Sequence, residues 1–369
     1  MPPVQYHEGK FPPELDWASL VPFIGPASAA IARYDGVLAA IPNAALLLSP
    51  LTTQEAVLSS RIEGTQATMV EVLEFEAGRP AVSPERRDDI HEILNYRRAM
   101  NAAVHALARL PLSGRVIREA HAVLLEGVRG QDKAPGEFRR TPVWIGPPGC
   151  TLEQARFVPI SADRLPDAVG RWEQYLHAEQ PDRLVQLAVL HAEFEALHPF
   201  LDGNGRLGRM VIPLFLWQVG FIRQPMFYIS AFFEAHRDEY YERLLAVSRD
   251  DDWVGWCRFF LGAVRAQAED NLAKATAILE LYGDMKRRFV DVTRSRYSIQ
   301  ALDWVFGRPI FRGSEFTTKA GIPRPTAKRL LSALQEVGVL TVLSAGAGRR
   351  GSVIAFPALL NIVEGGEVF

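Results

Sequence analysis

The chain has 369 residues, 48% of them hydrophobic and 23% charged, with a formal net charge of −2. These values are typical of a globular protein with two or three domains, and the charge gives no overall attraction to nucleic acid or to an anionic membrane. Two cysteines are too few for a disulfide framework or a zinc cluster. No apolar run is long enough to span a membrane and no signal peptide precedes the first helix, so we expect a cytoplasmic protein.

The first third of the chain predicts an extended arm followed by helices. Residues 11–15, with two prolines, read as extended chain, and a helix is expected from about 26 to 40. Residues 52–63 suit another helix, which Gly64 would end as its C′ residue. Further helices are predicted within 66–127, with a clear amphipathic pattern from 112 to 125.

The pattern changes at residue 136. Residues 136–146 alternate and are rich in β-formers, and residues 155–160 could form a return strand. A short β-hairpin in a helical protein is therefore expected here.

Helices predicted over 166–178 and 181–197 lead into the string His-Pro-Phe-Leu-Asp-Gly-Asn-Gly-Arg-Leu-Gly-Arg, residues 198–209. A second, mostly buried helix is predicted over 210–219. The string would then be a loop at the N-terminal end of that helix. Gly203 and Gly205 can take backbone angles closed to other residues, so successive N–H groups can form an anion-binding nest beside the helix dipole.

The side chains of this loop extend the same chemistry. Arg206 and Arg209 share a helical face and can bind phosphate oxygens. Asp202 can hold a Mg²⁺ that bridges phosphates, and His198 can accept a proton near neutral pH. This set of groups indicates phosphoryl or nucleotidyl transfer. An alternative reading takes His191, Glu195 and His198, which share one helical face, as three metal ligands, but it leaves the glycines and arginines unexplained.

The remaining chain predicts a helix from about 235 to 245 and a long helical stretch over 257–290. Residues 316–338 read as helix, turn, helix, followed by two strands at 341–343 and 352–356. These elements resemble a winged helix. Its basic face would consist of Arg324, Lys328, Arg329, Arg349 and Arg350.

The string at 198–209 resembles the signature of the Fic (Fido) family of protein adenylyltransferases. Every fixed position of that signature is met, namely His198, Phe200, Asp202, Gly203, Asn204, Gly205, Arg206 and Arg209. The resemblance implies a mainly α protein, a Fic-type helical bundle with a β-hairpin flap and a C-terminal winged-helix domain. The expected division is an N-terminal helical region (1–110) with an inhibitory helix at about 52–64, a catalytic core (111–265) with the flap at about 138–160, a helical linker (266–294) and a winged-helix-like domain (295–369).

The resemblance also implies the reaction, which is transfer of AMP from ATP to a Ser, Thr or Tyr hydroxyl of a protein with release of pyrophosphate. His198 would accept the proton of that hydroxyl and Asp202 would hold Mg²⁺. The residues expected to bind ATP and its phosphates are Gly203, Asn204, Gly205, Arg206, Leu207, Gly208 and Arg209.

Three further groups follow from the same resemblance. Ser59, Glu63 and Gly64 match the inhibitory motif of family members that carry an inhibitor N-terminal to the core, and Glu63 is expected to pair with Arg209. The adenine is expected beside Tyr240, Tyr241 and Ser248. A protein target is expected to dock on the flap at Val143, Trp144, Ile145 and Gly146.

Several alternatives stay open at this point. The same site could transfer UMP, phosphate or phosphocholine, or remove AMP from a modified protein. The chain could also be a DNA-binding regulator whose Fic domain senses a nucleotide. A homodimer, and a DNA or protein partner of the C-terminal domain, are compatible with the sequence, whereas a membrane partner is not expected.

Overall fold

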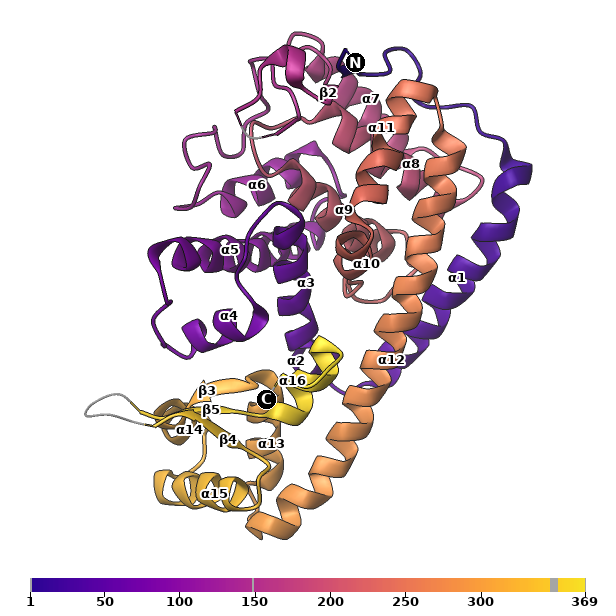
Figure 1. Ribbon diagram of the computed structural model, residues 1–369. Coiled ribbons are helices and arrows are strands. Elements are labelled where there is room, and N and C mark those ends of the chain that lie inside the picture. Colours follow the sequence, from indigo (N-terminus) through magenta and orange to yellow (C-terminus); the bar gives the residue numbers. More distant parts are fainter. Residues whose placement is uncertain (1, 148, 346–350, 369) are drawn as a thin grey trace. The chain divides into compact units, whose positions relative to one another are not determined.

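The computed structural model describes residues 2–147, 149–345 and 351–368. The chain is mainly helical and divides into two compact units (Figure 1). Unit 1 consists of Met1–Asp35, Leu58–Gly64 and Leu94–Glu269, and unit 2 consists of Gly36–Val57, Thr65–Ile93 and Asp270–Phe369. Both units are thus assembled from separate stretches, unlike the four consecutive segments expected from the sequence.

Some helices contribute residues to both units. These are α1 (Trp17–Ala40), α3 (Ser49–Ile62), α5 (Pro84–Leu107) and α12 (Trp253–Thr293). The elements that belong to unit 1 alone are β1 (Val4–Gln5), α6 (Gly114–Leu124), η1 (Leu152–Gln154), β2 (Phe157–Val158), α7 (Leu165–His177), α8 (Arg183–Leu197), α9 (Asn204–Gln218), α10 (Ser230–Ala235) and α11 (Arg237–Asp250).

Helix α8 is the central helix of unit 1. Asp182 caps its start by accepting hydrogen bonds from the N–H groups of Leu184 and Val185, both at 2.9 Å. Nearly all of its side chains are buried. Two tryptophans on neighbouring helices donate to its carbonyls, Trp172 to Leu190 at 2.9 Å and Trp256 to Ala188 at 2.7 Å. These contacts make α8 a fixed support for the loop that follows it.

Two helix boundaries differ from the sequence prediction. Helix α1 begins at Trp17 rather than at about 26, and it contains Pro22 and Pro26. Helix α9 begins at Asn204 rather than at about 210, so the second half of the glycine-rich string is helical. The predicted loop is therefore confined to residues 198–203.

The predicted hairpin is present only in reduced form. Residues 136–144 form no strand, and the hairpin consists of one antiparallel bridge between Ile145 and Phe157. Prolines at 142 and 147 flank this bridge and cannot donate a ladder hydrogen bond. Strand β2 gains its second neighbour from β1, which pairs with it in parallel, Val4 opposite Phe157 and Gln5 opposite Val158.

The N-terminal arm that carries β1 is anchored by buried polar side chains. Tyr6 donates to Oε1 of Glu193 at 2.6 Å, and Nε2 of His7 lies 2.8 Å from Oε2 of the same carboxylate. Nδ1 of His7 lies 2.7 Å from the hydroxyl oxygen of Ser248. Glu193 is fully buried on α8, so the arm is attached directly to the central helix.

Unit 2 contains a small three-stranded antiparallel sheet among short helices. Its own elements are α2 (Ala44–Leu47), α4 (Met69–Glu76), α13 (Ser298–Gly307), β3 (Ile310–Arg312), α14 (Gly313–Lys319), α15 (Arg324–Glu336), β4 (Thr341–Ser344), β5 (Val353–Ala355) and α16 (Pro357–Glu364). The strand order is β3-β5-β4. From α13 to β5 the order is helix, strand, helix, helix, strand, strand, which includes the predicted pair of helices and the two strands after it. The assignment of these elements to a winged-helix domain stays a prediction. Arg349 and Arg350, expected on its basic face, lie outside the described residues.

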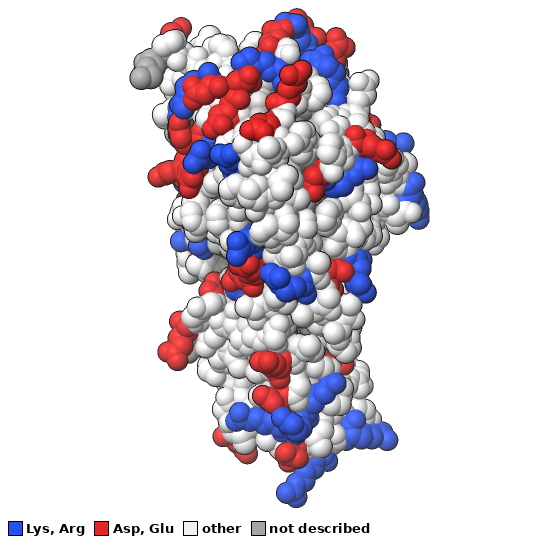
Figure 2. Space-filling view, turned by 90° about the vertical axis from the view of Figure 1, so that its right-hand side faces the viewer, with Lys and Arg blue, Asp and Glu red and all other residues white. Residues whose placement is uncertain are grey.

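Charges of both signs are mixed over the face presented in Figure 2, and Lys and Arg gather at the end where α12 finishes. In the part of the chain that the structure describes, no helix combines the length and the apolar character needed to cross a membrane.

Candidate active site

The loop between α8 and α9 holds its shape through two left-handed residues and one amide side chain. His198 ends α8 with φ 47° and ψ 61°, and Gly203 precedes α9 with φ 79°. The Asn204 side chain accepts a hydrogen bond from the Phe200 N–H at 2.8 Å and donates to the Phe200 carbonyl at 2.9 Å. Asn204 therefore closes the loop with its side chain, so that only its backbone is available to a phosphate.

Gly205 has a different role from the one predicted. It lies in the first turn of α9 with an ordinary helical φ, so it is not a left-handed nest residue. A Cβ on this residue would lie 2.2 Å from Oε1 of Glu63 and 3.0 Å from Nη1 of Arg209. Gly205 is needed because a carboxylate oxygen sits directly against the backbone at the helix N-terminus, where an anion is favoured.

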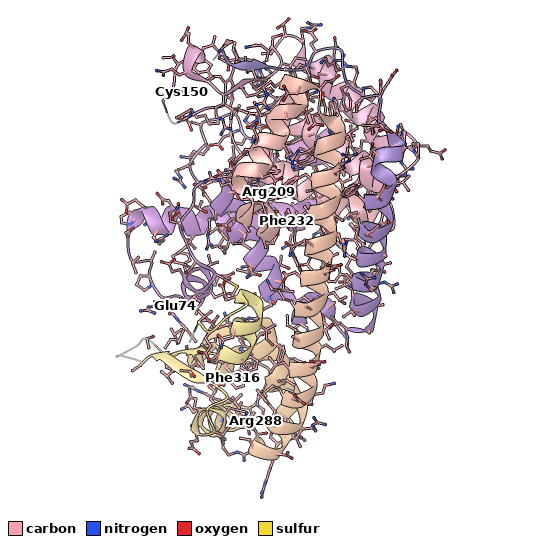
Figure 3. The ribbon with its side chains drawn as sticks, turned by 45° about the vertical axis from the view of Figure 1, so that its right-hand side comes forward. Glu74, Cys150, Arg209, Phe232, Arg288 and Phe316 are labelled. Atoms are coloured by element: carbon pink, nitrogen blue, oxygen red, sulfur yellow. The ribbon has the colours of Figure 1, made fainter. Side chains whose placement is uncertain are left out.

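Arg209 is held by the end of the predicted inhibitory helix. Its side chain is 1% exposed and lies inside unit 1 (Figure 3). Nε donates to the hydroxyl oxygen of Ser59 at 3.0 Å, and Nη2 donates to the Ser59 carbonyl at 2.8 Å and to Oε1 of Glu63 at 2.7 Å. Gly64 follows with φ 108°, as expected for a residue that ends the helix.

The electrostatics of the pair favour two charged partners. Burial works against the ionised Glu63 carboxylate, but the Arg209 guanidinium outweighs it, and the pKa of Glu63 is held below its ordinary value. Burial likewise disfavours the charged form of Arg209, and Glu63 more than compensates, so the pKa of Arg209 is raised. Glu63 remains 34% exposed because it also lines an open cavity.

That cavity has a volume of about 420 Å³. His198, Glu63, Gly205 and Arg209 line one part of it. The rest of the wall comes from the flap, α8 and α11, namely Ile145, Gly146, Pro147, Arg156, Phe157, Ala192, Glu195, Ala196, Arg237, Tyr241, Leu244 and Leu245. Its size and mixed lining suit a small polar ligand with an apolar portion.

The residues predicted to neighbour the adenine are separated by the structure. Tyr241 lines the cavity, with the Arg237 guanidinium 5.7 Å from the centre of its ring. Tyr240 is 1% exposed and its hydroxyl oxygen lies 2.8 Å from Nε2 of His191, in the core. Ser248 does not line the cavity, because its hydroxyl is hydrogen bonded to His7 of the N-terminal arm.

Only some of the residues predicted for the flap and for phosphate binding line the cavity. Ile145 and Gly146 line the cavity, whereas Trp144 is 43% exposed and donates to the Cys150 carbonyl at 2.9 Å. Val143 borders a separate hollow beside the arm. On α9, Leu207 is 1% exposed among core side chains and Gly208 faces Glu195, so neither residue lines the cavity.

His198 is set up as a neutral imidazole. Its Nδ1 is buried, which leaves Nε2 as the nitrogen able to meet a ligand. Burial lowers the pKa of His198 to about 4. At neutral pH the ring is therefore deprotonated and can accept a proton.

Arg139 is a site residue that the sequence did not reveal. It is 3% exposed, and its guanidinium donates to the carbonyls of His198 (2.9 Å), Leu197 (3.2 Å), Thr141 (3.3 Å) and Ile160. Burial lowers the pKa of Arg139 to about 10. The side chain joins the flap to the end of α8 and so fixes the backbone on which the imidazole is mounted.

His121 supports the other end of the loop. It is fully buried on α6, stacks on Phe200 with ring centres 3.9 Å apart, and its Nε2 lies 3.1 Å from the Asp202 carbonyl. Its Nδ1 accepts a hydrogen bond from the Gly136 N–H at 2.8 Å. Burial lowers the pKa of His121 to about 4, which keeps the ring neutral and both hydrogen bonds intact.

The Asp202 carboxylate is suited to a divalent cation shared with a ligand. Its side chain is 40% exposed and lies 3.4 Å from Nη2 of Arg206. Among the described residues no group of three or more His, Cys, Asp or Glu side chains could hold a metal alone. Mg²⁺ commonly binds through one or two carboxylates together with substrate phosphates, so one exposed carboxylate fits Mg²⁺ that arrives with a nucleotide.

The alternative metal reading of residues 191, 195 and 198 is wrong. Nε2 of His191 lies 2.8 Å from the Tyr240 hydroxyl and Nδ1 lies 3.2 Å from the Gly208 carbonyl, so both ring nitrogens are occupied.

Comparisons with known proteins agree on one family. The Fic/DOC family N-terminal model matches residues 21–105 and the Fic/DOC family model matches residues 111–216, together just over half of the chain. The chain is 29% identical over 194 residues to the protein adenylyltransferase Fic of Drosophila grimshawi, and 29% identical over 164 residues to that of Drosophila willistoni. These matches include 52% and 43% of this chain but only 37% and 31% of the relatives.

Solved structures show the same fold. A Fic family protein from Desulfovibrio desulfuricans G20 superposes with a TM-score of 0.61 at 21% identity, covering 94% of this chain and 98% of the other. Fic-1 from C. elegans superposes with a TM-score of 0.54 at 18% identity, covering 71% of this chain and 73% of the other. From the two family models, the glycine-rich loop and the fold, the chain belongs to the Fic/DOC family.

Proposed function

We propose that this protein transfers AMP from ATP to a hydroxyl group of a protein target, and that Glu63 restrains the reaction. The observation that carries the proposal is the shared cavity. A neutral imidazole, a buried guanidinium and a helix N-terminus line it together, and a carboxylate of the same chain lies where an anionic phosphate oxygen would be stabilised.

The chemistry follows from these groups. The target hydroxyl attacks the α-phosphorus while His198 accepts its proton, a new oxygen–phosphorus bond forms, and the bond to the bridging oxygen of pyrophosphate breaks. Arg206 and Arg209 and the N–H groups at the start of α9 balance the charge of the phosphates. Asp202 would hold Mg²⁺, which supplies further positive charge to the phosphates when bound. Full agreement with Asp-Gly-Asn-Gly-Arg favours AMP over other transferred groups.

The contact between Glu63 and Arg209 supports restraint. The Arg209 guanidinium donates three hydrogen bonds to Ser59 and Glu63, and these N–H donors would otherwise be available to a phosphate. A target segment would dock beside Ile145 and Gly146, where the flap borders the cavity.

The test uses α-labelled ATP with Mg²⁺ and the full chain. We expect Glu63→Gly to increase labelling of protein by roughly tenfold or more. The reason is that ATP no longer competes with Glu63 for Arg209, and about 1.4 kcal/mol of binding free energy corresponds to a factor of ten. Adding His198→Ala to that variant should reduce labelling by roughly 10²-fold or more while ATP still binds. Glu179→Gly, which removes an exposed carboxylate just after α7, is the matched control.

Equal labelling by the parent and Glu63→Gly would refute the restraint. Persistent labelling by the His198→Ala double variant would refute the assigned base. Release of AMP from a modified protein, with no labelling from ATP, would reverse the proposed direction of the reaction.

A second activity is supported by unit 2. Helix α15 exposes Arg324 and Lys328 near its N-terminus, the part of a helix-turn-helix that enters the major groove of DNA. We propose that this helix binds DNA.

A further inference from the structure

Helix α8 carries two buried carboxyl groups with opposite surroundings. Both oxygens of Glu193 are within hydrogen-bond distance of partners on the N-terminal arm. Glu195 lies two residues later and lines the cavity beside His198. Its Oε1 is buried and has no hydrogen-bond partner among residues 2–147, 149–345 and 351–368. A buried polar atom without a partner is costly in a folded protein and calls for an explanation.

The position of this carboxyl is fixed by α9. A Cβ on Gly208 would lie 2.3 Å from Oε1 of Glu195, so only a glycine leaves room for the carboxyl there. The side chain of Glu195 is 13% exposed. Its neighbours in the cavity wall include Ala192, Ala196, Leu244 and Leu245. Glu195 thus borders the cavity together with these apolar side chains, and its Oε1 is buried against Gly208 of α9.

Burial, together with the charges around the cavity, determines the protonation state of Glu195. Burial raises the pKa of Glu195 to about 8, Glu63 adds to the rise and Arg209 opposes it. His191 is neutral because burial lowers its pKa to about 3. The charged or titratable groups of the neighbouring elements are Glu63 after α3, His191 on α8, His198 directly after α8, Arg209 on α9, Arg237, Tyr240 and Tyr241 on α11, and Arg156 in the flap. The carboxyl is therefore an O–H donor at neutral pH.

We propose that Glu195 binds the nucleotide as a neutral carboxylic acid, donating a hydrogen bond to an oxygen of the α-phosphate held beside His198. Glu195 in the last turn of α8 and His198 directly after the helix both line the cavity, so both groups can contact the same ligand. A donor to an anionic oxygen gives a strong hydrogen bond, whereas an ionised carboxylate at this point would repel the phosphate. The inference rests on the proposed use of ATP but not on transfer taking place.

The experiment measures the dissociation constant of ATP with Mg²⁺ by calorimetry. The reference protein is the Glu63→Gly, His198→Ala double variant, in which the competing carboxylate is absent and turnover is prevented. Binding is measured at pH 7 and pH 9.5 for this reference and for the same protein with Glu195→Gln, Glu195→Ala or Glu179→Gln. Glu179→Gln makes the same glutamate-to-glutamine substitution at an exposed site outside the cavity.

We expect the reference and the Glu179→Gln protein to lose roughly tenfold in affinity between pH 7 and pH 9.5, as Glu195 ionises and its hydrogen bond is lost. Glu195→Gln, which keeps a donor but cannot ionise, should show no such loss. Glu195→Ala should bind roughly tenfold more weakly at pH 7, and Glu195→Gln should restore affinity relative to it.

An equal loss of affinity in the Glu195→Gln protein would overturn the inference, as would equal affinities of the Gln and Ala variants at pH 7. If Glu63→Gly transfers no label but ATP binding shows the expected dependence on Glu195, the proposed reaction fails while this inference stands.

Discussion

At the scale of single residues, the loop depends on neutral histidines as much as on glycines. His121 holds the Asp202 carbonyl and the Gly136 N–H with its two ring nitrogens. A protonated ring would donate from both nitrogens and could not accept from Gly136. Protonation of this one residue therefore breaks a contact that positions the loop before α9.

This predicts a pH-dependent stability. The pKa of His121 is about 4 in the fold and near 6.5 when exposed, so the unfolded chain takes up the proton first as the pH falls. The stabilisation is complete above pH 6.5 and is lost between there and pH 4, roughly 2 kcal/mol of it between pH 7 and pH 5. Urea unfolding at the two pH values should show a smaller difference for His121→Gln than for the parent.

The control is His177→Gln, which changes an exposed histidine at the end of α7. It should keep the pH dependence of the parent. An unchanged pH dependence in His121→Gln would contradict the role assigned to the buried ring.

Some residues of the site can be recognised from sequence motifs and others cannot. His198, Glu63 and Arg209 stand in short strings whose spacing carries their chemistry, and the structure brings all three to one cavity. Arg139 could not be found in this way, because its partners are backbone carbonyls of distant residues and a carbonyl has no sequence pattern. The expectation that Ser248 borders the nucleotide failed for a related reason, because its hydrogen-bond partner His7 is remote in the sequence.

At the scale of elements, local pattern misplaced the start of α9 and the extent of the flap. Glycines at 203, 205 and 208 lower helix propensity, so the string reads as a loop. Packing decides otherwise, because Gly205 and Gly208 lie where the carboxyls of Glu63 and Glu195 leave no room for a Cβ. In the flap, alternation suggested two strands, but ladder pairing is limited to Ile145 opposite Phe157.

The N-terminal arm should stiffen the flap, because β1 is hydrogen bonded to β2. Val4 N–H donates to the Arg156 carbonyl and Tyr6 N–H to the Val158 carbonyl, both at 3.0 Å. His7→Ala removes a partner of the buried Glu193 and should cost roughly 2–3 kcal/mol of local stability. Hydrogen exchange at Val4 and Tyr6 should then accelerate.

Lys10→Ala provides the matched comparison on the same arm. Its amine lies 3.5 Å from Asp251 with both side chains about half exposed, and such pairs contribute little. Faster exchange in Lys10→Ala than in His7→Ala would show that the buried contact does not anchor the arm.

At the scale of the whole molecule, a net charge of −2 conceals local differences. Exposed basic side chains of unit 2 include Arg324 and Lys328 on α15, Arg287 near the end of α12, and Arg294 and Arg296 just after α12. The Asp and Glu side chains that offset this positive charge are spread over the rest of the chain as well as over unit 2. Overall charge is thus a poor guide to a nucleic-acid surface confined to one helix.

For the full chain we expect Arg324→Ala with Lys328→Ala to weaken binding to duplex DNA by roughly tenfold at low salt, and to reduce the slope of log affinity against log salt by about 2. Fluorescence anisotropy over a salt series measures both. Arg115→Ala with Lys10→Ala removes two positive charges from unit 1 and is the control. Identical salt slopes for the two double variants would argue against DNA binding through α15.

The contact between Glu63 and Arg209 joins two parts of one polypeptide. Its formation is therefore a first-order event, indifferent to how dilute the protein is. A molecule that displaces the carboxylate competes with a group of the same chain, whose effective concentration is fixed by the fold. That molecule must therefore bind tightly or be present at a high concentration.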